Sequence, residues 1–572
     1  MRALLLLPFL LLPLSAQKHV PPKRSSQVQD GFGINADLPR DPYLPWDRHW
    51  WTRMFDAGVS WIRIGQYENT SDYTSWDWIE QKRGVLAVPD GLDDYVDSLV
   101  DNGVKVQVQL LYGNPMYTSL AGKLPDAIVP EPGSFHNPDR SLYSAFWPPK
   151  TPEQIAAFIK YVRFMVGHFR GRIRYYALWN EQDIDYWNPQ PNAEEYGRLL
   201  KAFVPAVHGA DPEAKVIYGG QADPTRDFAR RALDACGCAA GIDVFAYHTY
   251  PGYGRNLNPE TMDHGAYGEE SPAKLRELVR GYPGIRRDIP FWDDEFNSIP
   301  SWTGSDESVQ AKYIPRGLVY NWAQGVRTFV WLLAAGTDGN EYDDFGMIHG
   351  LRYLPDDFTP RPVYYALQNT NALFADTRLD PAIKIALHDK AQPFLAYGFR
   401  SKAGKPIVAY WLAAHSEPGN VFPAMHADLT IANSGIRRPV LIDVVSGNIE
   451  PIHKPEAGDM FPNVLVRDSV MAIADEDYFD WPVLPEAPSS LAATTAGNAV
   501  QLRWQVHGGE AVSAVVERRA GDAGVWTRIA TQAVASSEYA DGGAPSGVVC
   551  YRVRAANAGG ESAYSNVVRV RR

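Results

Sequence analysis

The chain of 572 residues is too long for one hydrophobic core, so its length predicts two to four domains. Its net charge of −12 argues against nucleic acid and anionic membrane surfaces as main partners. Aromatic residues are abundant, with 17 Trp and 30 Tyr, and such rings stack on sugars or fill interfaces.

The N-terminus reads MRALLLLPFLLLPLSAQ, with one basic residue, an apolar run, and small residues at Ser15 and Ala16. This pattern is typical of a secretory signal peptide over residues 1–17, and it is too short to span a bilayer. No later stretch is apolar enough for a transmembrane helix. We therefore expect a soluble protein that is secreted or periplasmic, with no membrane insertion.

Cysteines are few in a chain that we expect to be exported. Only Cys236, Cys238 and Cys550 are present, which excludes a disulfide framework and a four-ligand zinc cage. We expect Cys236 and Cys238 to be small buried or loop residues, and a bridge between them is the less favoured alternative. The sequence indicates no metal site and no cofactor.

Short strand-like runs alternate with helical stretches through the first two-thirds of the chain. The helical stretches include residues 151–169 and 192–210, where apolar residues recur at helical spacing. The strand-like runs cover residues 31–37, 60–67, 104–111, 174–182, 215–220, 243–251, 290–298 and 328–336. This α/β pattern predicts a (β/α)8 TIM barrel over residues 29–375. A doubly wound sheet is the weaker alternative, because no Gly-rich phosphate loop follows the first strand.

The helical pattern ends near residue 375. Residues 376–483 contain short strand-like runs between turn residues, which predicts an antiparallel β-sandwich. A Pro-rich linker at residues 481–490 leads to an all-β segment over residues 484–572. In that segment Trp504, a late Tyr-x-Val-x-Ala strand and a Gly-Glu-Ser turn resemble a fibronectin type III domain.

Polar residues gather at the carboxyl ends of the predicted barrel strands, where barrel enzymes carry their function. The seven residues concerned are Arg63, Asn180, Glu181, His248, Tyr250, Glu295 and Trp331. Neighbouring residues of a regular strand face opposite sides, so Asn180 and Glu181 share one site only where the strand ends or bulges. We therefore expect irregular backbone at residues 180–181.

Two carboxylates that face each other suit glycoside cleavage, because one is needed as an acid and the other as an anion. Unequal surroundings hold two carboxyl groups in different protonation states at one pH. Arg63 beside one Glu would keep that Glu ionised. Tyr250 would supply a hydroxyl donor, and Trp331 an apolar wall.

The segments LWNEQD and WDDEFNS resemble the acid/base and nucleophile motifs of the clan A glycoside hydrolases. The barrel-plus-sandwich layout is most similar to glycoside hydrolase family 39, which includes β-xylosidases and α-L-iduronidases. The resemblance spans about residues 31–480, and it implies one role for each residue of the rim. Glu181 would be the general acid/base, and Asn180 would donate to the sugar 2-hydroxyl. Glu295 would be the nucleophile, with Arg63 and Tyr250 hydrogen-bonded to it. His248 and Trp331 would line the sugar subsite.

One residue departs from the resemblance: Asp294, which precedes Glu295 where related enzymes more often have a neutral residue. On a regular strand Asp294 would face away from the site, and Asp293 would share the face of Glu295. The acidic cluster is a poor metal cage, because consecutive strand residues diverge.

Each rim residue alone has an ordinary structural interpretation, such as a solvated carboxylate or a core histidine. Taken together they favour a secreted retaining glycoside hydrolase that cleaves an oligo- or polysaccharide. The alternative is a catalytically silent carbohydrate-binding or adhesion protein on the same scaffold. We expect a carbohydrate substrate and no nucleic acid.

Overall fold

A computed structural model describes most of the chain. It covers residues 17–36, 49–65, 73–118, 124–128, 146–251, 257–264, 270–331, 333, 343–349, 359–388, 393–420, 425–453, 458–522 and 524–572. Residues 1–16 of the predicted signal peptide lie outside these ranges. Within the ranges, no helix combines the length and the apolar character needed to cross a bilayer.

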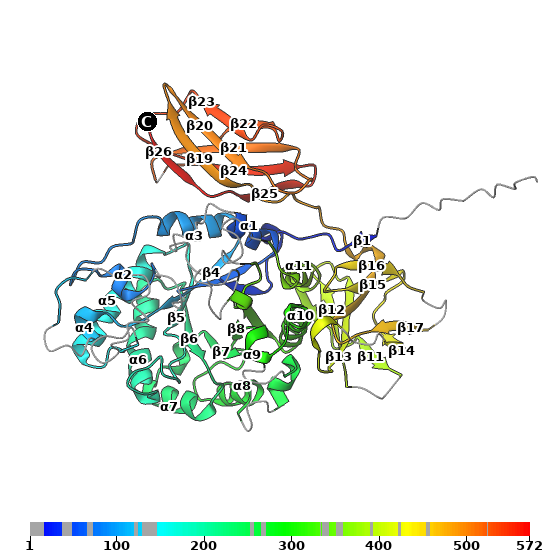
Figure 1. Ribbon diagram of the computed structural model, residues 1–572. Helices are drawn as coiled ribbons and strands as arrows, with labels where there is room; N and C mark the ends of the chain where they lie inside the picture. The colour runs from blue at the N-terminus through cyan, green and yellow to red at the C-terminus, as the bar shows by residue number, and fades with distance from the viewer. Residues whose placement is uncertain are drawn as a thin grey trace, which may run out of the picture.

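Eight parallel strands close into a barrel, with the first strand paired to the last (Figure 1). The strands are β2 (Gly33–Asn35), β3 (Trp61–Ile64), β4 (Lys105–Leu110), β5 (Tyr175–Leu178), β6 (Lys215–Gln221), β7 (Val244–Thr249), β8 (Phe291–Phe296) and β9 (Val326–Val330). Each strand falls on or overlaps one of the eight predicted runs, so the predicted TIM barrel is confirmed.

Helices cover the outside of the barrel between successive strands (Figure 1). The longer ones are α1 (His49–Asp56), α3 (Leu92–Asp101), α5 (Pro152–His168), α6 (Ala193–Ala210), α7 (Arg226–Cys236), α8 (Pro272–Gly281), α10 (Glu307–Ala323) and α11 (Pro362–Phe374). Short turns of helix are α2 (Trp76–Ile79), α4 (Pro115–Thr118), α9 (Pro300–Thr303), η1 (Ser25–Gln27), η3 (Ala239–Gly241), η4 (Pro259–His264) and η5 (Asp343–Phe345). The start of α5 shows how local sequence sets these bounds, because Thr151 and Gln154 form a capping box and Pro152 occupies the first helical position.

The end of α7 corrects one expectation about the cysteines. Cys236 and Cys238 form a disulfide, where the sequence favoured unlinked residues. Gly237 lies between them with a left-handed φ of 57°, which ends the helix and turns the chain back. The two Cα atoms lie 5.1 Å apart, a normal separation for a bridge.

The amino-terminal end of the barrel is closed by aromatic side chains. Trp61 and Trp292 meet with ring centroids 5.1 Å apart, and Trp61 and Tyr175 with centroids 5.0 Å apart. Phe329 completes this interior cluster at 5.4 Å from Trp292. The barrel interior is therefore a packed core and not a channel.

Two antiparallel sheets follow the barrel and form the predicted sandwich. The larger has the order β1-β16-β15-β18-β13-β12-β10 and the smaller β11-β14-β17. Their strands are β1 (Lys18–His19), β10 (Thr377–Leu379), β11 (Lys384–Leu387), β12 (Phe394–Ser401), β13 (Pro406–Leu412), β14 (Met425–Ala432), β15 (Pro439–Asp443), β16 (Asn448–Pro451), β17 (Met460–Val466) and β18 (Met471–Asp475), with short helical turns η6 (Pro418–Asn420) and η7 (Glu476–Tyr478). The sandwich lies beside α10, where Lys312 pairs with Asp468 at 2.9 Å (Figure 1).

The last segment contains two further antiparallel sheets. Their strands are β19 (Ser489–Ala496), β20 (Ala499–Gln505), β21 (Ser513–Ala520), β22 (Thr527–Ala533), β23 (Glu538–Asp541), β24 (Val548–Asn557), β25 (Gly560–Tyr564) and β26 (Val568–Arg571). Trp504 and Tyr551 lie in one core, as the sequence suggested, while the fibronectin type III assignment stays a prediction.

The C-terminal segment lies over α1 and α3 of the barrel (Figure 1). Arg519 pairs with Asp94 at 2.9 Å, and the backbone N–H of Tyr564 donates to Asn102 at 2.8 Å. His49 and His507 stack with ring centroids 3.4 Å apart. The Pro-rich linker therefore leads to a segment that contacts the barrel directly.

Candidate active site

The backbone after β5 is irregular, as the sequence predicts. The strand ends at Leu178, and Trp179 and Glu181 both have left-handed backbone, with φ of 64° and 49°. Two hydrogen bonds to β6 hold the turn, from Glu181 N to Gly220 O at 2.9 Å and from the Gln182 side chain to Gly219 O at 2.9 Å. This turn directs the side chains of Asn180 and Glu181 to partners in the same site.

A bulge in β8 corrects the expectation for Asp293 and Asp294. The pairing of β8 with β9 shifts between Asp293 and Phe296, so the regular alternation of side chains is lost there. Asp293 binds Thr249 and, at 3.0 Å, Asn321 of α10 on the outside of the barrel. Asp294 instead lies inside the barrel, and its neighbour Glu295 also meets barrel-interior groups.

Arg63 connects these carboxylates at the centre of the site. Its guanidinium is fully buried and lies 2.6 Å from Glu295 Oε1, 2.6 Å from Asn180 Oδ1 and 3.3 Å from Asp294 Oδ2. Burial opposes the charge of the guanidinium, but Asp294 and Glu295 more than offset this and raise the pKa of Arg63. Arg63 is therefore a permanent cation beside Glu295.

Glu295 accepts hydrogen bonds on both carboxylate oxygens. Arg63 donates to Oε1, and the Tyr250 hydroxyl donates to Oε2 at 2.7 Å. Donors on both oxygens stabilise the negative charge of the carboxylate and fix its orientation.

Glu181 has different surroundings. Burial, followed by the nearby charge of Glu295, raises the pKa of Glu181 above its usual value. His248 Nδ1 lies 2.8 Å from Glu181 Oε1 and offsets part of this shift. Burial alone would lower the pKa of His248, but Glu295, Asp294 and Glu181 raise it to about 10.

One carboxylate oxygen of Glu181 and one of Glu295 lie within 4.8 Å of each other, and a nitrogen of His248 lies within the same distance of both. Three such atoms could hold a metal ion, and His49, Asp56 and Glu486 form a second set within the same limit. In the first set Arg63 already forms an ion pair with Glu295 at 2.6 Å, and its positive charge disfavours a metal cation at the same place.

Trp331 follows β9 and packs against Tyr250, whose hydroxyl donates to Glu295. It is buried and packs on Phe345 and Tyr250, with ring centroids 5.0 Å and 6.4 Å away. The Asn297 side-chain amide donates to the backbone oxygen of Phe345 at 2.9 Å and also to that of Trp331, and so holds these two residues together.

The structure brings all seven residues singled out in the sequence into one cluster. It adds polar residues that sequence reasoning missed. Gln107 donates to Asp294 at 2.7 Å, and Gln109 to Asn180 at 3.0 Å. The alternation of Gln with Val in KVQVQL of β4 was the available signal, because glutamines on one face of a buried strand need polar partners.

Comparisons with known proteins address the fold. No protein-family profile matches the chain, and no curated protein matches it in sequence. A family 39 glycoside hydrolase from the gut symbiont Bacteroides cellulosilyticus WH2 superimposes with a TM-score of 0.57 at 18% identity, over 80% of this chain and 83% of that one. The bacterial orthologue of human α-L-iduronidase superimposes with a TM-score of 0.50 at 14% identity, over 97% of this chain and 98% of that one.

Both solved structures resemble the fold seen here, a barrel followed by β-sheets. At sequence identities of 18% and 14%, this likeness shows a shared fold. The chain has the fold of the family 39 glycoside hydrolases.

Proposed function

We propose that this protein is a retaining glycoside hydrolase that cleaves an oligo- or polysaccharide by double displacement on Glu181 and Glu295. The observation that carries the proposal is the approach of their carboxylate oxygens to within 4.8 Å. Retaining enzymes hold the two carboxyl groups about 5–5.5 Å apart, whereas inverting enzymes need a wider gap that admits a water. The likeness to a family 39 glycoside hydrolase supports the same conclusion.

In the first step Glu295 attacks the anomeric carbon and Glu181 donates its proton to the leaving oxygen. The raised pKa of Glu181 favours the protonated form that this role needs. Arg63 and Tyr250 hold the carboxylate of Glu295 as an oriented anion. The bond to the leaving group breaks as the bond to Glu295 Oε forms, which leaves a covalent glycosyl-enzyme.

Asn180 is oriented to hold the sugar during this step. Its Oδ1 accepts from Arg63 at 2.6 Å and from Gln109 at 3.0 Å, so the oxygen of the amide is already used. The amide NH2 group is then left as the donor, as the role toward a sugar 2-hydroxyl requires.

In the second step Glu181, now ionised, removes a proton from a water that attacks the same anomeric carbon. The bond to Glu295 breaks and the sugar leaves with its original configuration. His248 at 2.8 Å remains a hydrogen-bond partner of Glu181 in both steps.

The predicted signal peptide leads us to propose that the enzyme acts after export, in the periplasm or outside the cell. The N-terminal residue of the exported protein, read by mass spectrometry, tests this step. Cleavage close to residue 17 is expected, and retention of residues 1–17 in a cytoplasmic protein would contradict it.

The function is tested with a panel of 2,4-dinitrophenyl glycosides and the matching 2-deoxy-2-fluoro glycosides. At least one sugar should be turned over, and its fluoro analogue should label Glu295 covalently, as peptide mass spectrometry would show. Glu295→Gln should remain folded, lose turnover and escape the label. A label on another carboxylate would refute the assignment, and binding of sugars without turnover across the panel would favour the silent carbohydrate-binding protein.

A further inference from the structure

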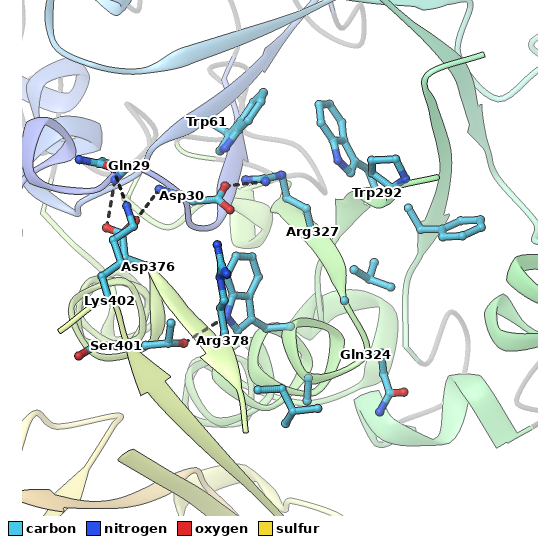
Figure 2. A pocket seen from close by; sticks show the side chains of 18 of the residues that line it. Gln29, Asp30, Trp61, Trp292, Gln324, Arg327, Asp376, Arg378, Ser401 and Lys402 are labelled. Carbon is cyan, nitrogen blue, oxygen red and sulfur yellow. Dashed lines mark hydrogen bonds and ion pairs between the residues drawn. The ribbon is translucent and has the colours of Figure 1, made fainter. Parts of the chain in front are cut away.

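A second cleft of about 1250 Å³ lies at the opposite end of the barrel from the candidate active site. One wall consists of residues at the starts of barrel strands, among them Trp61, Trp292 and Arg327. The other wall consists of β10 and the end of β12, which belong to the sandwich. Figure 2 shows Arg327, Arg378 and Lys402 around this space, with Trp61 and Trp292 on the barrel side. The aromatic cluster inside the barrel separates the cleft from Glu181 and Glu295.

The lining of this cleft is positive in a protein whose net charge is −12. Its basic side chains are Lys105, Arg327, Arg378, Arg400 and Lys402, and its acidic side chains are Asp30 and Asp376. Both acids are already engaged, since Asp30 pairs with Arg327 at 2.6 Å and Asp376 with Lys402 at 3.0 Å. Among the described residues that line the cleft, no acidic side chain is therefore left to balance the remaining positive charge.

Arg378 contributes most plainly to this excess of positive charge. It lies directly opposite Arg400 in the antiparallel pair of β10 and β12, and both line the cleft. Like charges that face each other across two strands destabilise a sheet. Arg400 is compensated by Asp380 at 2.6 Å, but the Arg378 guanidinium has no hydrogen-bond or ion-pair partner among the described residues. An anion in the cleft would remove this repulsion.

Aromatic and hydrogen-bond-donor groups in the same lining indicate that the part of the ligand without charge is a sugar. Tyr175 and Trp322 are partly exposed there, which is the exposure that a sugar face needs for stacking. The indole N–H of Trp61 is buried and has no hydrogen-bond partner within the part of the chain that the structure describes. The space also exceeds the volume of most small-molecule pockets, about 300–1,000 Å³, and so suits an extended ligand.

We propose that this cleft binds an acidic oligosaccharide, whose sugar units carry carboxylate or sulfate groups. The anionic part of the inference rests on the charges of the lining, and the saccharide part rests also on the proposed function. Because the cleft lies at the amino-terminal end of the barrel, it holds a chain without cleaving it.

Titration calorimetry with three hexasaccharides tests the proposal. A hexamer of galacturonic acid supplies carboxylates, a heparin-derived hexasaccharide supplies sulfates, and xylohexaose is neutral. At least one acidic hexamer should bind, more weakly as salt rises, and the tighter of the two identifies the anionic group. Arg378→Glu should raise its Kd at least tenfold. Arg437→Glu is the matched control, because Arg437 is an exposed arginine of the same sandwich outside the cleft, and its Kd should stay within twofold of the wild type.

Several outcomes would overturn the inference. Equal binding of xylohexaose, an equal effect of Arg437→Glu, or tighter binding of oligothymidylate would each do so. Arg378→Gln serves as the second variant if the charge reversal prevents folding. Turnover of a small aryl glycoside separates this site from the proposed function: the Arg378 variants should keep wild-type turnover, and the acidic hexamer should not compete with the aryl glycoside. Competitive inhibition would place the hexamer in the active site instead.

Discussion

His248 joins Glu181 to Asp294 through the two nitrogens of its ring. Nδ1 lies 2.8 Å from Glu181 Oε1, and Nε2 lies 3.3 Å from Asp294 Oδ1. A buried imidazole between two carboxylates is held in one orientation and favours its charged form. Asp294, which the resemblance did not assign, therefore acts on Glu181 through His248 and is a positioning residue.

Asp294→Asn removes a carboxylate that lies beside both Arg63 and His248, so it is expected to lower kcat at least tenfold. It should also lower the pKa of His248 from about 10, which an NMR titration of labelled histidine measures. Asp293→Asn is the matched control, since Asp293 makes its hydrogen bonds outside the barrel. A kcat loss in Asp294→Asn with no change in the titration of His248 would show that Asp294 is merely structural.

The pH dependence of kcat/KM should report the acid role of Glu181. Glu181 must be protonated for the first step, so activity is present below its pKa and lost as pH rises through it. Because burial and Glu295 raise this pKa, the alkaline limb should lie above the usual carboxyl value of 4.5. The wild type should show that limb with a glycoside whose leaving group needs protonation, and with a 2,4-dinitrophenyl glycoside, which needs no acid, both the wild type and Glu181→Gln should lack it. A limb that is unchanged in the variant belongs to another group.

Glu181→Ala should separate the two steps of the reaction. With a good leaving group Glu295 is still glycosylated, so the intermediate should accumulate as a burst of released phenol. Azide fits where the carboxylate was and needs no base, so it should restore turnover and yield a glycosyl azide. Its anomeric configuration should match that of the substrate. An inverted azide, identified by NMR, would show that Glu295 acts as a base.

Gly220 is expected to tolerate no side chain, because of its approach to His248. A Cβ at this position would lie 2.1 Å from His248 Nε2 and 2.8 Å from Asp294 Oδ1. Gly220→Ala should therefore displace the imidazole and lower kcat by about tenfold or more, since small misplacements at a reacting centre are costly. Gly209→Ala is the control, because no atom of another described segment lies within 4 Å of a Cβ there. Equal kinetics of the two variants would count against the predicted displacement.

Deletion of residues 485–572 should leave turnover of a small aryl glycoside unchanged and lower the melting temperature by several degrees. The rim residues all come from the barrel, which explains the first result. The second follows because the deletion removes the ion pair of Arg519 with Asp94 and the bond from Ala487 N to Asp56 at 3.2 Å. Calorimetry and kinetics on the same preparation measure both. A large loss of turnover in a folded truncation would show that the segment also supports the active site.

The sequence by itself determined the barrel, the sandwich and the positions of the rim residues along the strands. The alternation of apolar strands with amphipathic helices is a local property, and it is enough to predict parallel strands with their carboxyl ends together. Glu181 and Glu295 follow from this, because each lies where such a strand ends. The glutamines of β4 carry a further local signal of a polar barrel interior.

Only the tertiary structure decided which way neighbouring side chains face where a strand is irregular. Asp293 and Asp294 exchange the faces that regular alternation assigns to them, because the bulge in β8 depends on its pairing with β7 and β9. The same holds for the amino-terminal cleft, where Trp61 and Arg378 come together from distant parts of the chain. Strand register and domain packing are set by contacts between remote segments, and no local pattern of residues encodes them.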